Sequence, residues 1–133
     1  MKSAADAVIE FNRDILKIPN RQLATLGEDE FRHLTLCFRE EFEHEFGVAH
    51  KAQDIVQCVD ALLDGIYFAL GGLYKMGLNS DQITACFAAI HEYNMTKKKG
   101  QLEKRATGDV ADAIKQEGIA TPEERIAKIL GLL

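Results

Sequence analysis

The sequence has no tryptophan, only two prolines and ten glycines among 133 residues, and no run in which strand-forming residues alternate with polar ones. These absences exclude proline-rich and collagen-like chains and argue against a β-sandwich. The composition, 47% hydrophobic and 28% charged, is that of a chain with one buried core. Because this length is typical of one domain, we expect a single domain over residues 1–133.

The cysteines are few and poorly spaced for cross-linking. Cys37, Cys58 and Cys86 are odd in number and form no C-x-x-C pair, so no disulfide framework or zinc site is predicted. Each lies in an apolar stretch, where a free thiol behaves as a small core residue.

One stretch, residues 55–74, is apolar enough to raise the question of a membrane span. Asp60 and Asp64 stand near its middle, where carboxylates would be costly in lipid. The N-terminal segment carries Asp6 and Glu10, so it does not resemble a signal peptide. We therefore expect no membrane partner and a cytoplasmic location.

Charge is distributed unevenly along the chain. Residues 28–64 carry ten carboxylates and three basic side chains, whereas residues 95–105 carry five basic side chains and one glutamate. The net charge of −5 disfavours a nucleic-acid partner. An acidic segment followed by a basic one suits a metal and an anionic ligand, although two solvated faces of opposite sign would give the same pattern.

Apolar residues recur at helical spacing in the first part of the chain. A first helix follows Ser3, which resembles a capping box with Asp6, and is expected to end at Pro19. A second helix is expected from about Glu28 to Gly47. Its apolar stripe consists of Phe31, Leu34, Phe38, Phe42 and Phe46.

A third, longer helix is predicted from about Asp54 to Met76. It is apolar almost all round, so we expect it to be the buried centre of a bundle. A fourth helix is expected to begin at Asn79 or Ser80, and a basic loop follows over residues 96–108.

Thr121 and Glu124 form a second capping box, with a proline at the first position of a short last helix. The predicted fold class is therefore all-α. We expect a four-helix bundle core over about residues 3–95 and a C-terminal arm over about residues 96–133.

Asp60 and Asp64 are the only charged residues from Ile55 to Tyr74. Because they are four positions apart, both project from one side of the helix. Two buried carboxylates cost free energy unless a positive group meets them, and a hard divalent cation with oxygen ligands would do so. The alternative is that this side of the helix faces solvent.

The second helix supplies further carboxylates. Phe38 and Phe42 define its inward face, which places Glu41 at one edge of that face and Glu45 within it, whereas Glu40 points largely away. A short connector should make the second and third helices antiparallel neighbours, so their acidic stripes can form a carboxylate cage. Taken alone, a glutamate-rich helix is usually a solvated face.

Asn94 and Lys97 lie where the fourth helix runs into the basic loop. Their spacing of three lets both reach one bound group, and an amide with an ammonium suits phosphate oxygens or a sugar hydroxyl. Lysines at a helix end also interact favourably with the helix dipole without any ligand. His91 could be a metal ligand, but a lone helical histidine is more often structural.

Three motifs follow one another at set intervals: E-E at Glu40, D-x-x-x-D-x-x-Y from Asp60, and H-x-x-N-M-x-K from His91. Together they resemble the all-α nucleoside triphosphate pyrophosphohydrolases, the MazG-like enzymes, and most closely the small phosphoribosyl-ATP-pyrophosphohydrolase-like members found in phages and bacteria. The resemblance covers residues 11–97. It continues weakly through Asp112-Ala113-Ile114-Lys115 and Pro122-Glu123.

The resemblance implies a hydrolase that converts a nucleoside or deoxynucleoside triphosphate to the monophosphate and pyrophosphate. It also implies Mg²⁺ as the cofactor, with Mn²⁺ as an alternative, and dimers that often pair into tetramers. The predicted catalytic residues are Glu40 and Glu41, the predicted metal ligands are Glu41, Glu45, Asp60 and Asp64, and the predicted substrate-binding residues are Asn94 and Lys97.

Two positions depart from the pattern of that family. His44 stands where a third glutamate is expected, and Gln57 stands at a commonly acidic position. Because the helical wheel turns Glu45 inward, we expect Glu45 to replace the missing glutamate. The alternative function is a non-catalytic helical module that binds a nucleotide or a partner helix and has a decayed metal site.

The third helix also bears on assembly. Its apolar residues lie nearly all round it, and four short helices of one chain are too few to cover it. We therefore expect a homodimer or a homotetramer, as the resemblance also implies.

Overall fold

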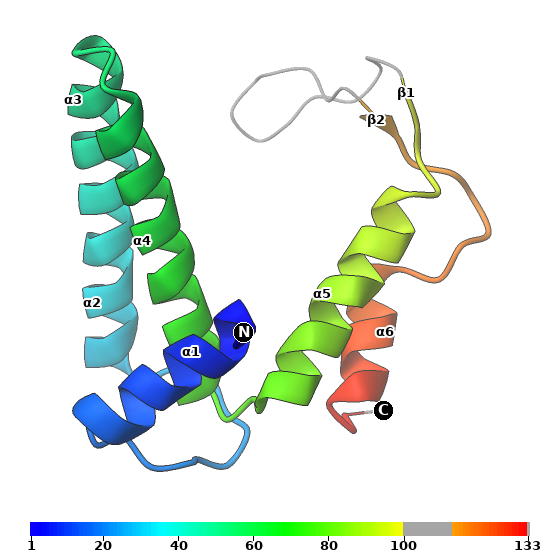
Figure 1. Ribbon diagram of the computed structural model, residues 1–133. Helices are drawn as coiled ribbons and strands as arrows, with labels where there is room; N and C mark the ends of the chain where they lie inside the picture. Colours follow the sequence, from blue (N-terminus) through cyan, green and yellow to red (C-terminus); the bar gives the residue numbers. More distant parts are fainter. Residues whose placement is uncertain (100–112, 133) are drawn as a thin grey trace. The chain divides into compact units, whose positions relative to one another are not determined.

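The computed structural model describes residues 1–99 and 113–132, and most of them are helical (Figure 1). The predicted all-α fold class is confirmed. The described residues belong to two compact units, Met1–Ser80 and Asp81–Leu133. The elements are α1 (Ala4–Glu10), the π-helical η1 (Phe11–Ile15), α2 (Glu28–Phe38), the π-helical η2 (Arg39–Glu45), α3 (Phe46–Lys51), α4 (Ile55–Lys75), α5 (Ser80–Asn94), β1 (Lys98–Lys99), β2 (Ala113–Ile114) and α6 (Pro122–Ile129).

The first unit is built on a helical hairpin. α2, η2 and α3 follow one another without a break, and α4 returns beside them (Figure 1). The turn contains Gln53 at a φ of +55° and Asp54, whose Oδ1 accepts a hydrogen bond from the N–H of Gln57 at 3.1 Å. Asp54 is therefore the N-cap of α4, a structural role that explains its place before the helix.

Two helix ends differ from the expected ones. Gly47 lies inside α3 and does not end the second helix, because a glycine stops a helix only when it adopts a left-handed conformation. That conformation occurs instead at Gln53. The first helix ends at Ile15, before Pro19, because Lys17 has a φ of +58° that no helix accommodates.

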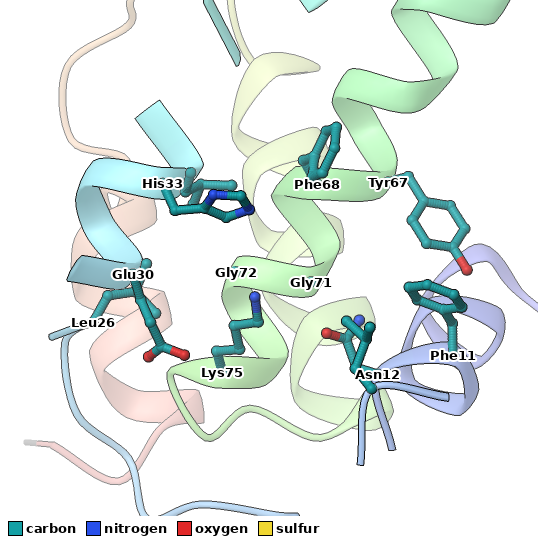
Figure 2. A pocket seen from close by; sticks show the side chains of 12 residues that line it. Phe11, Asn12, Leu26, Glu30, His33, Tyr67, Phe68, Gly71, Gly72 and Lys75 are labelled. Carbon is teal, nitrogen blue, oxygen red and sulfur yellow. The ribbon is translucent and has the colours of Figure 1, made fainter. Parts of the chain in front are cut away.

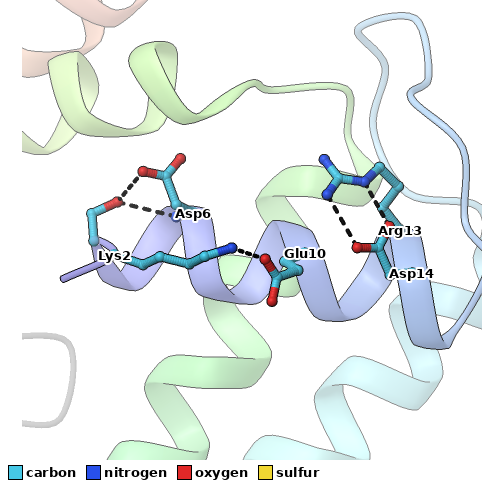
Figure 3. Close-up of polar contacts among 6 residues, drawn as sticks. Lys2, Asp6, Glu10, Arg13 and Asp14 are labelled. Carbon is cyan, nitrogen blue, oxygen red and sulfur yellow. Dashed lines mark hydrogen bonds and ion pairs between the residues drawn. The ribbon is translucent and has the colours of Figure 1, made fainter.

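The start of α1 follows the capping box that the sequence predicts. Ser3 Oγ accepts a hydrogen bond from the N–H of Asp6 at 3.1 Å and donates one to its carboxylate at 2.9 Å (Figure 3). Exposed ion pairs join Lys2 to Glu10 and Arg13 to Asp14. Because exposed pairs contribute little to stability, the cap is the feature that fixes where this helix begins.

The connector between η1 and α2 lies against the end of α4. The Tyr74 hydroxyl donates a hydrogen bond to the carbonyl of Ile18 at 2.7 Å. Gly77 has a φ of +98°, and a Cβ atom there would lie 2.7 Å from the carbonyl oxygen of Gln22. Both the backbone angle and the close approach require glycine at this position.

The large apolar side chains of α4 are more exposed than we expected for the centre of a bundle. Ile55 is 73% exposed and Leu63 is 58% exposed. The first unit covers α4 on one side only, and that side carries mostly small residues. The buried residues of α4 are Ala61, Gly65, Gly71, Gly72 and Tyr74.

By length and composition alone, α4 could cross a membrane, and it is the single such helix in the part of the chain that the structure describes. A core helix of a soluble protein meets the same criterion. Asp60 and Asp64 near its middle favour that second interpretation.

The second unit consists of α5, a short β-ladder and α6. β1 pairs with β2 in antiparallel register, Lys98 opposite Ile114 and Lys99 opposite Ala113. Lys98 and Lys99, which we expected in the basic loop, therefore form a short strand. Residues 100–108 of that loop and Asp112 lie outside the described residues.

α6 begins at the capping box that we expected. Thr121 Oγ1 accepts a hydrogen bond from the N–H of Glu124 at 3.3 Å. Arg125 then attaches α6 to α5, because it donates to the carbonyl of Ala89 at 3.4 Å and forms an ion pair with Glu92.

Candidate metal centre

Three carboxylates meet between η2 and α4. Glu41, Glu45 and Asp64 each place an oxygen within 4.8 Å of the other two. Glu41 and Glu45 come from η2, and Asp64 comes from the facing side of α4. The hairpin thus brings together carboxylates from the two acidic stripes that the sequence predicts to face each other.

The helix that carries the two glutamates is wound as a π-helix at this point. The N–H of Phe46 bonds to the carbonyl of Glu41, five residues back. A π turn contains more residues than an α turn, so Glu41 and Glu45 lie more nearly in line along the axis. Single π turns inside α-helices occur frequently at functional sites, and this one lies at the carboxylate cluster.

The three carboxylates disturb one another's ionisation. The pKa of Glu41 is raised to about 7, first by its hydrogen bond with Glu45, then by burial and by the negative charges of Glu45, Asp64 and Glu40. The pKa of Asp64 is raised by burial and by the charges of Asp60 and Glu45. The cluster therefore carries more negative charge than its surroundings stabilise.

The atom that most clearly lacks a partner is Glu41 Oε2. It is buried, and no donor reaches it from the described residues. A buried acceptor without a donor costs free energy, and oxygen atoms from three carboxylates match the ligand preference of Mg²⁺ and Mn²⁺. The residues present fit a hard divalent cation.

A groove lies beside this cluster. Glu45 belongs to both, and the groove is also lined by Glu40, His44, Gln57 and Asp60. Asp60 is exposed and is not one of the three clustered carboxylates, so its role as a fourth metal ligand stays a prediction. Asp60 lies one helical turn, about 6 Å, closer than Asp64 to the turn of the hairpin, and it lines the groove together with Val48 and Ala49 of α3.

Glu40 and His44 line the groove and are not part of the carboxylate cluster. All three of Glu40, His44 and Glu45 are exposed, but only Glu45 among them places a carboxylate oxygen in the cluster. The predicted replacement of the missing glutamate by Glu45 agrees with this geometry, although its role as a ligand stays a prediction.

Asn94 and Lys97 belong to the second unit. Their predicted binding of the phosphate and sugar of a nucleotide stays a prediction. Lys97 Nζ lies over the ring of Tyr93, 5.5 Å from its centroid, while Asn94 and His91 are exposed. The cation–π contact holds the ammonium of Lys97 at the end of α5.

A second pocket in the first unit was not anticipated from the sequence. Figure 2 shows Asn12, Glu30, His33 and Lys75 around it, with Tyr67 beside Phe11 at one edge. Asn12 is 4% exposed, and its Nδ2 donates to the carbonyl of Val8 at 2.9 Å. The available signal was an amide in the middle of an apolar helical stripe.

Gly65 is also unanticipated. It is a glycine in the middle of an apolar helix, directly after a clustered carboxylate, and such glycines usually have a packing reason. The packing reason is the ring of Phe42, which lies where a side chain at position 65 would begin.

A helical hairpin whose two arms bring three carboxylates together is the arrangement that the resemblance to the all-α pyrophosphohydrolases implies. The family model for phosphoribosyl-ATP pyrophosphohydrolase matches residues 8–94, which include both acidic helices and Asn94. The chain belongs to this family, within the MazG-like superfamily. Membership implies a pyrophosphohydrolase that acts on a nucleotide. No curated protein sequence matches the chain.

Proposed function

We propose that this protein is a Mg²⁺-dependent pyrophosphohydrolase that converts a nucleoside or deoxynucleoside triphosphate and water to the monophosphate and pyrophosphate. One observation carries this proposal: the buried Glu41 Oε2 without a donor, inside a cluster of three carboxylates. Family membership supports the reaction class. The nature of the base and of the sugar is left to experiment.

Glu41, Glu45 and Asp64 would hold the ion, and Asp60 lies close enough to affect the charge of Asp64. When bound, Mg²⁺ or Mn²⁺ would neutralise charge on the triphosphate and so favour attack at the α-phosphorus. In return, the positive charge would stabilise the ionised form of carboxylates that now repel one another.

The remaining groups have roles that follow from their chemistry. Glu40 lies in the groove beside Glu45, where its carboxylate can accept a proton from the attacking water. Glu41 is the other candidate for this role. Asn94 and Lys97 would bind the phosphate and sugar oxygens, with the lysine stabilising charge on the leaving pyrophosphate.

The exposed face of α4 supports a homodimer, which can pair further into a tetramer. Large apolar side chains remain exposed on a helix that also carries part of the site, and burying them against a second copy would remove them from water. This assembly has no membrane or nucleic-acid partner in our proposal, and its location is the cytoplasm. The exposed residues are Ile55, Val56, Val59, Leu62, Leu63, Ile66 and Tyr67.

Pyrophosphate release from a panel of ribonucleoside and deoxyribonucleoside triphosphates tests the proposal. We expect release with Mg²⁺ and none after chelation with EDTA, and the best substrate identifies the base and the sugar. Nucleotide binding without turnover under every condition would support the alternative of a non-catalytic binding module with a decayed site at His44 and Gln57.

A further inference from the structure

The ring of Phe42 occupies the space where any other residue at position 65 would have its side chain. A Cβ atom built on Gly65 would lie 2.1 Å from both Cε1 and Cζ of Phe42. Real Cβ atoms essentially never approach a carbon atom so closely. The ring of one helix therefore rests directly on the backbone of the other.

This contact lies at the carboxylate cluster. Phe42 directly follows Glu41 in η2, and Gly65 directly follows Asp64 in α4. The separation of the two backbones at this level fixes how far the Glu41 and Glu45 carboxylates are from that of Asp64. A cation site tolerates little error in that separation, because ligand distances vary by only about 0.2 Å.

The ring of Phe42 also contacts a ring one turn earlier in the same continuous helix. It stacks on Phe38 with a centroid separation of 5.7 Å and an interplanar angle of 5°. A methyl group at Gly65 must therefore break this stack or push the two helices apart. The first change removes the ring that sets the spacing at the cluster, and the second increases that spacing.

We propose that Phe42 and Gly65 are positioning residues for the metal centre, with the ring acting as a spacer that sets the distance between η2 and α4. The inference rests on the proposed function in one respect, namely that a divalent cation binds at Glu41, Glu45 and Asp64. It adds a reason for a glycine in the middle of the most apolar helix of the chain.

Two other glycines provide matched controls. A Cβ atom at Gly72 would lie 2.8 Å from Cδ2 of Leu34, so Gly72→Ala crowds the same pair of helices two turns away from the cluster. A Cβ atom at Gly47 would meet nothing within 4 Å, so Gly47→Ala changes only the helical propensity. A purely structural role for Gly65 would make it behave like Gly72.

The experiment measures Mn²⁺ affinity by isothermal titration calorimetry and thermal unfolding of the metal-free protein. The Gly65→Ala variant should bind Mn²⁺ about ten-fold more weakly or worse, as supporting contacts around metal ligands typically do when lost. Phe42→Leu should also weaken binding, because the spacer is removed. The double variant Gly65→Ala/Phe42→Leu should recover most of the affinity, because the new methyl group takes the space that the ring vacates.

Gly72→Ala should lower the melting temperature of the metal-free protein and leave its Mn²⁺ affinity unchanged. Gly47→Ala should lower neither the melting temperature nor the Mn²⁺ affinity. Unchanged affinity in folded Gly65→Ala, an equal loss in Gly72→Ala, or no recovery in the double variant would overturn the positioning role while the proposed function stands. If Gly65→Ala does not fold, the comparison of Phe42→Leu with the double variant decides. A wild-type protein that binds no divalent cation would refute the proposed function and this inference together.

Discussion

Glu41 and Glu45 lie one turn apart in a π-helical segment with carboxyl oxygens within 4.8 Å of each other, and a hydrogen bond between these groups is the first cause of the raised pKa of Glu41. Two carboxyl groups form such a bond only while one of them holds a proton, so a proton and a cation compete for this pair. The same contact thus links stability, pH and metal affinity.

The first prediction concerns pH and the metal-free protein. The pKa of Glu41 in the folded protein, about 7, exceeds the ordinary glutamate value of 4.5, so the folded state binds more protons than the unfolded state between these values. The free energy of unfolding should therefore fall as pH rises through this range. Urea unfolding in EDTA should show a shallower fall for Glu41→Gln than for the wild type. Parallel profiles for the two proteins would contradict the raised pKa.

A second prediction concerns the response to metal. Mg²⁺ binds only the folded protein, so a concentration one hundred times its dissociation constant should stabilise the fold by about 2.7 kcal/mol. Asp64→Asn should remove most of this gain and most pyrophosphate release, because it removes the α4 carboxylate of the cluster. An Asp64→Asn protein that still responds fully to Mg²⁺ would show that the ion binds elsewhere.

The third prediction separates Glu45 from His44. Glu45 is part of the carboxylate cluster and His44 is not, so Glu45→Gln should reduce Mg²⁺-supported turnover strongly and His44→Ala should have little effect. Steady-state kinetics at saturating Mg²⁺ provide the measurement. The reverse result, together with a preference for zinc or nickel, would assign the ligand role to the imidazole.

A fourth prediction concerns assembly. Light scattering at micromolar concentration should give at least a dimer for the wild type. Leu62→Glu places a charge on the exposed apolar face of α4 and should yield monomers, whereas Leu36→Glu, at a similarly exposed residue of α2, serves as the control. A wild type that is monomeric at this concentration would contradict the prediction.

The fifth prediction concerns Gly77. Alanine there must adopt a φ near +98° and approach the Gln22 carbonyl, so Gly77→Ala should cost about 1–3 kcal/mol in the free energy of unfolding. Gly47→Ala, at an open helical position, should be neutral or slightly stabilising. Urea unfolding of both variants provides the comparison, and equal stability of the two would show that the connector moves away at little cost.

The sequence by itself determined most of the helices. The caps at Ser3, Asp54 and Thr121 act within one turn of chain, and the apolar spacing of α4 is a local pattern. Both can therefore be recognised in the sequence without knowing which helix packs against which. It also determined that Asp60 and Asp64 are unusual, because no other charge occurs from Ile55 to Tyr74.

Only the tertiary structure decided which carboxylates meet. Asp64 faces Glu41 and Glu45 while Asp60 lies in the neighbouring groove, a distinction that depends on how α4 is aligned with η2 and α3. That alignment depends on packing at contacts such as the one between the ring of Phe42 and the bare backbone of Gly65. Helical periodicity fixes the angles between residues of one helix, but the angle between two helices depends on side-chain volumes at their contact, which no single-helix pattern contains.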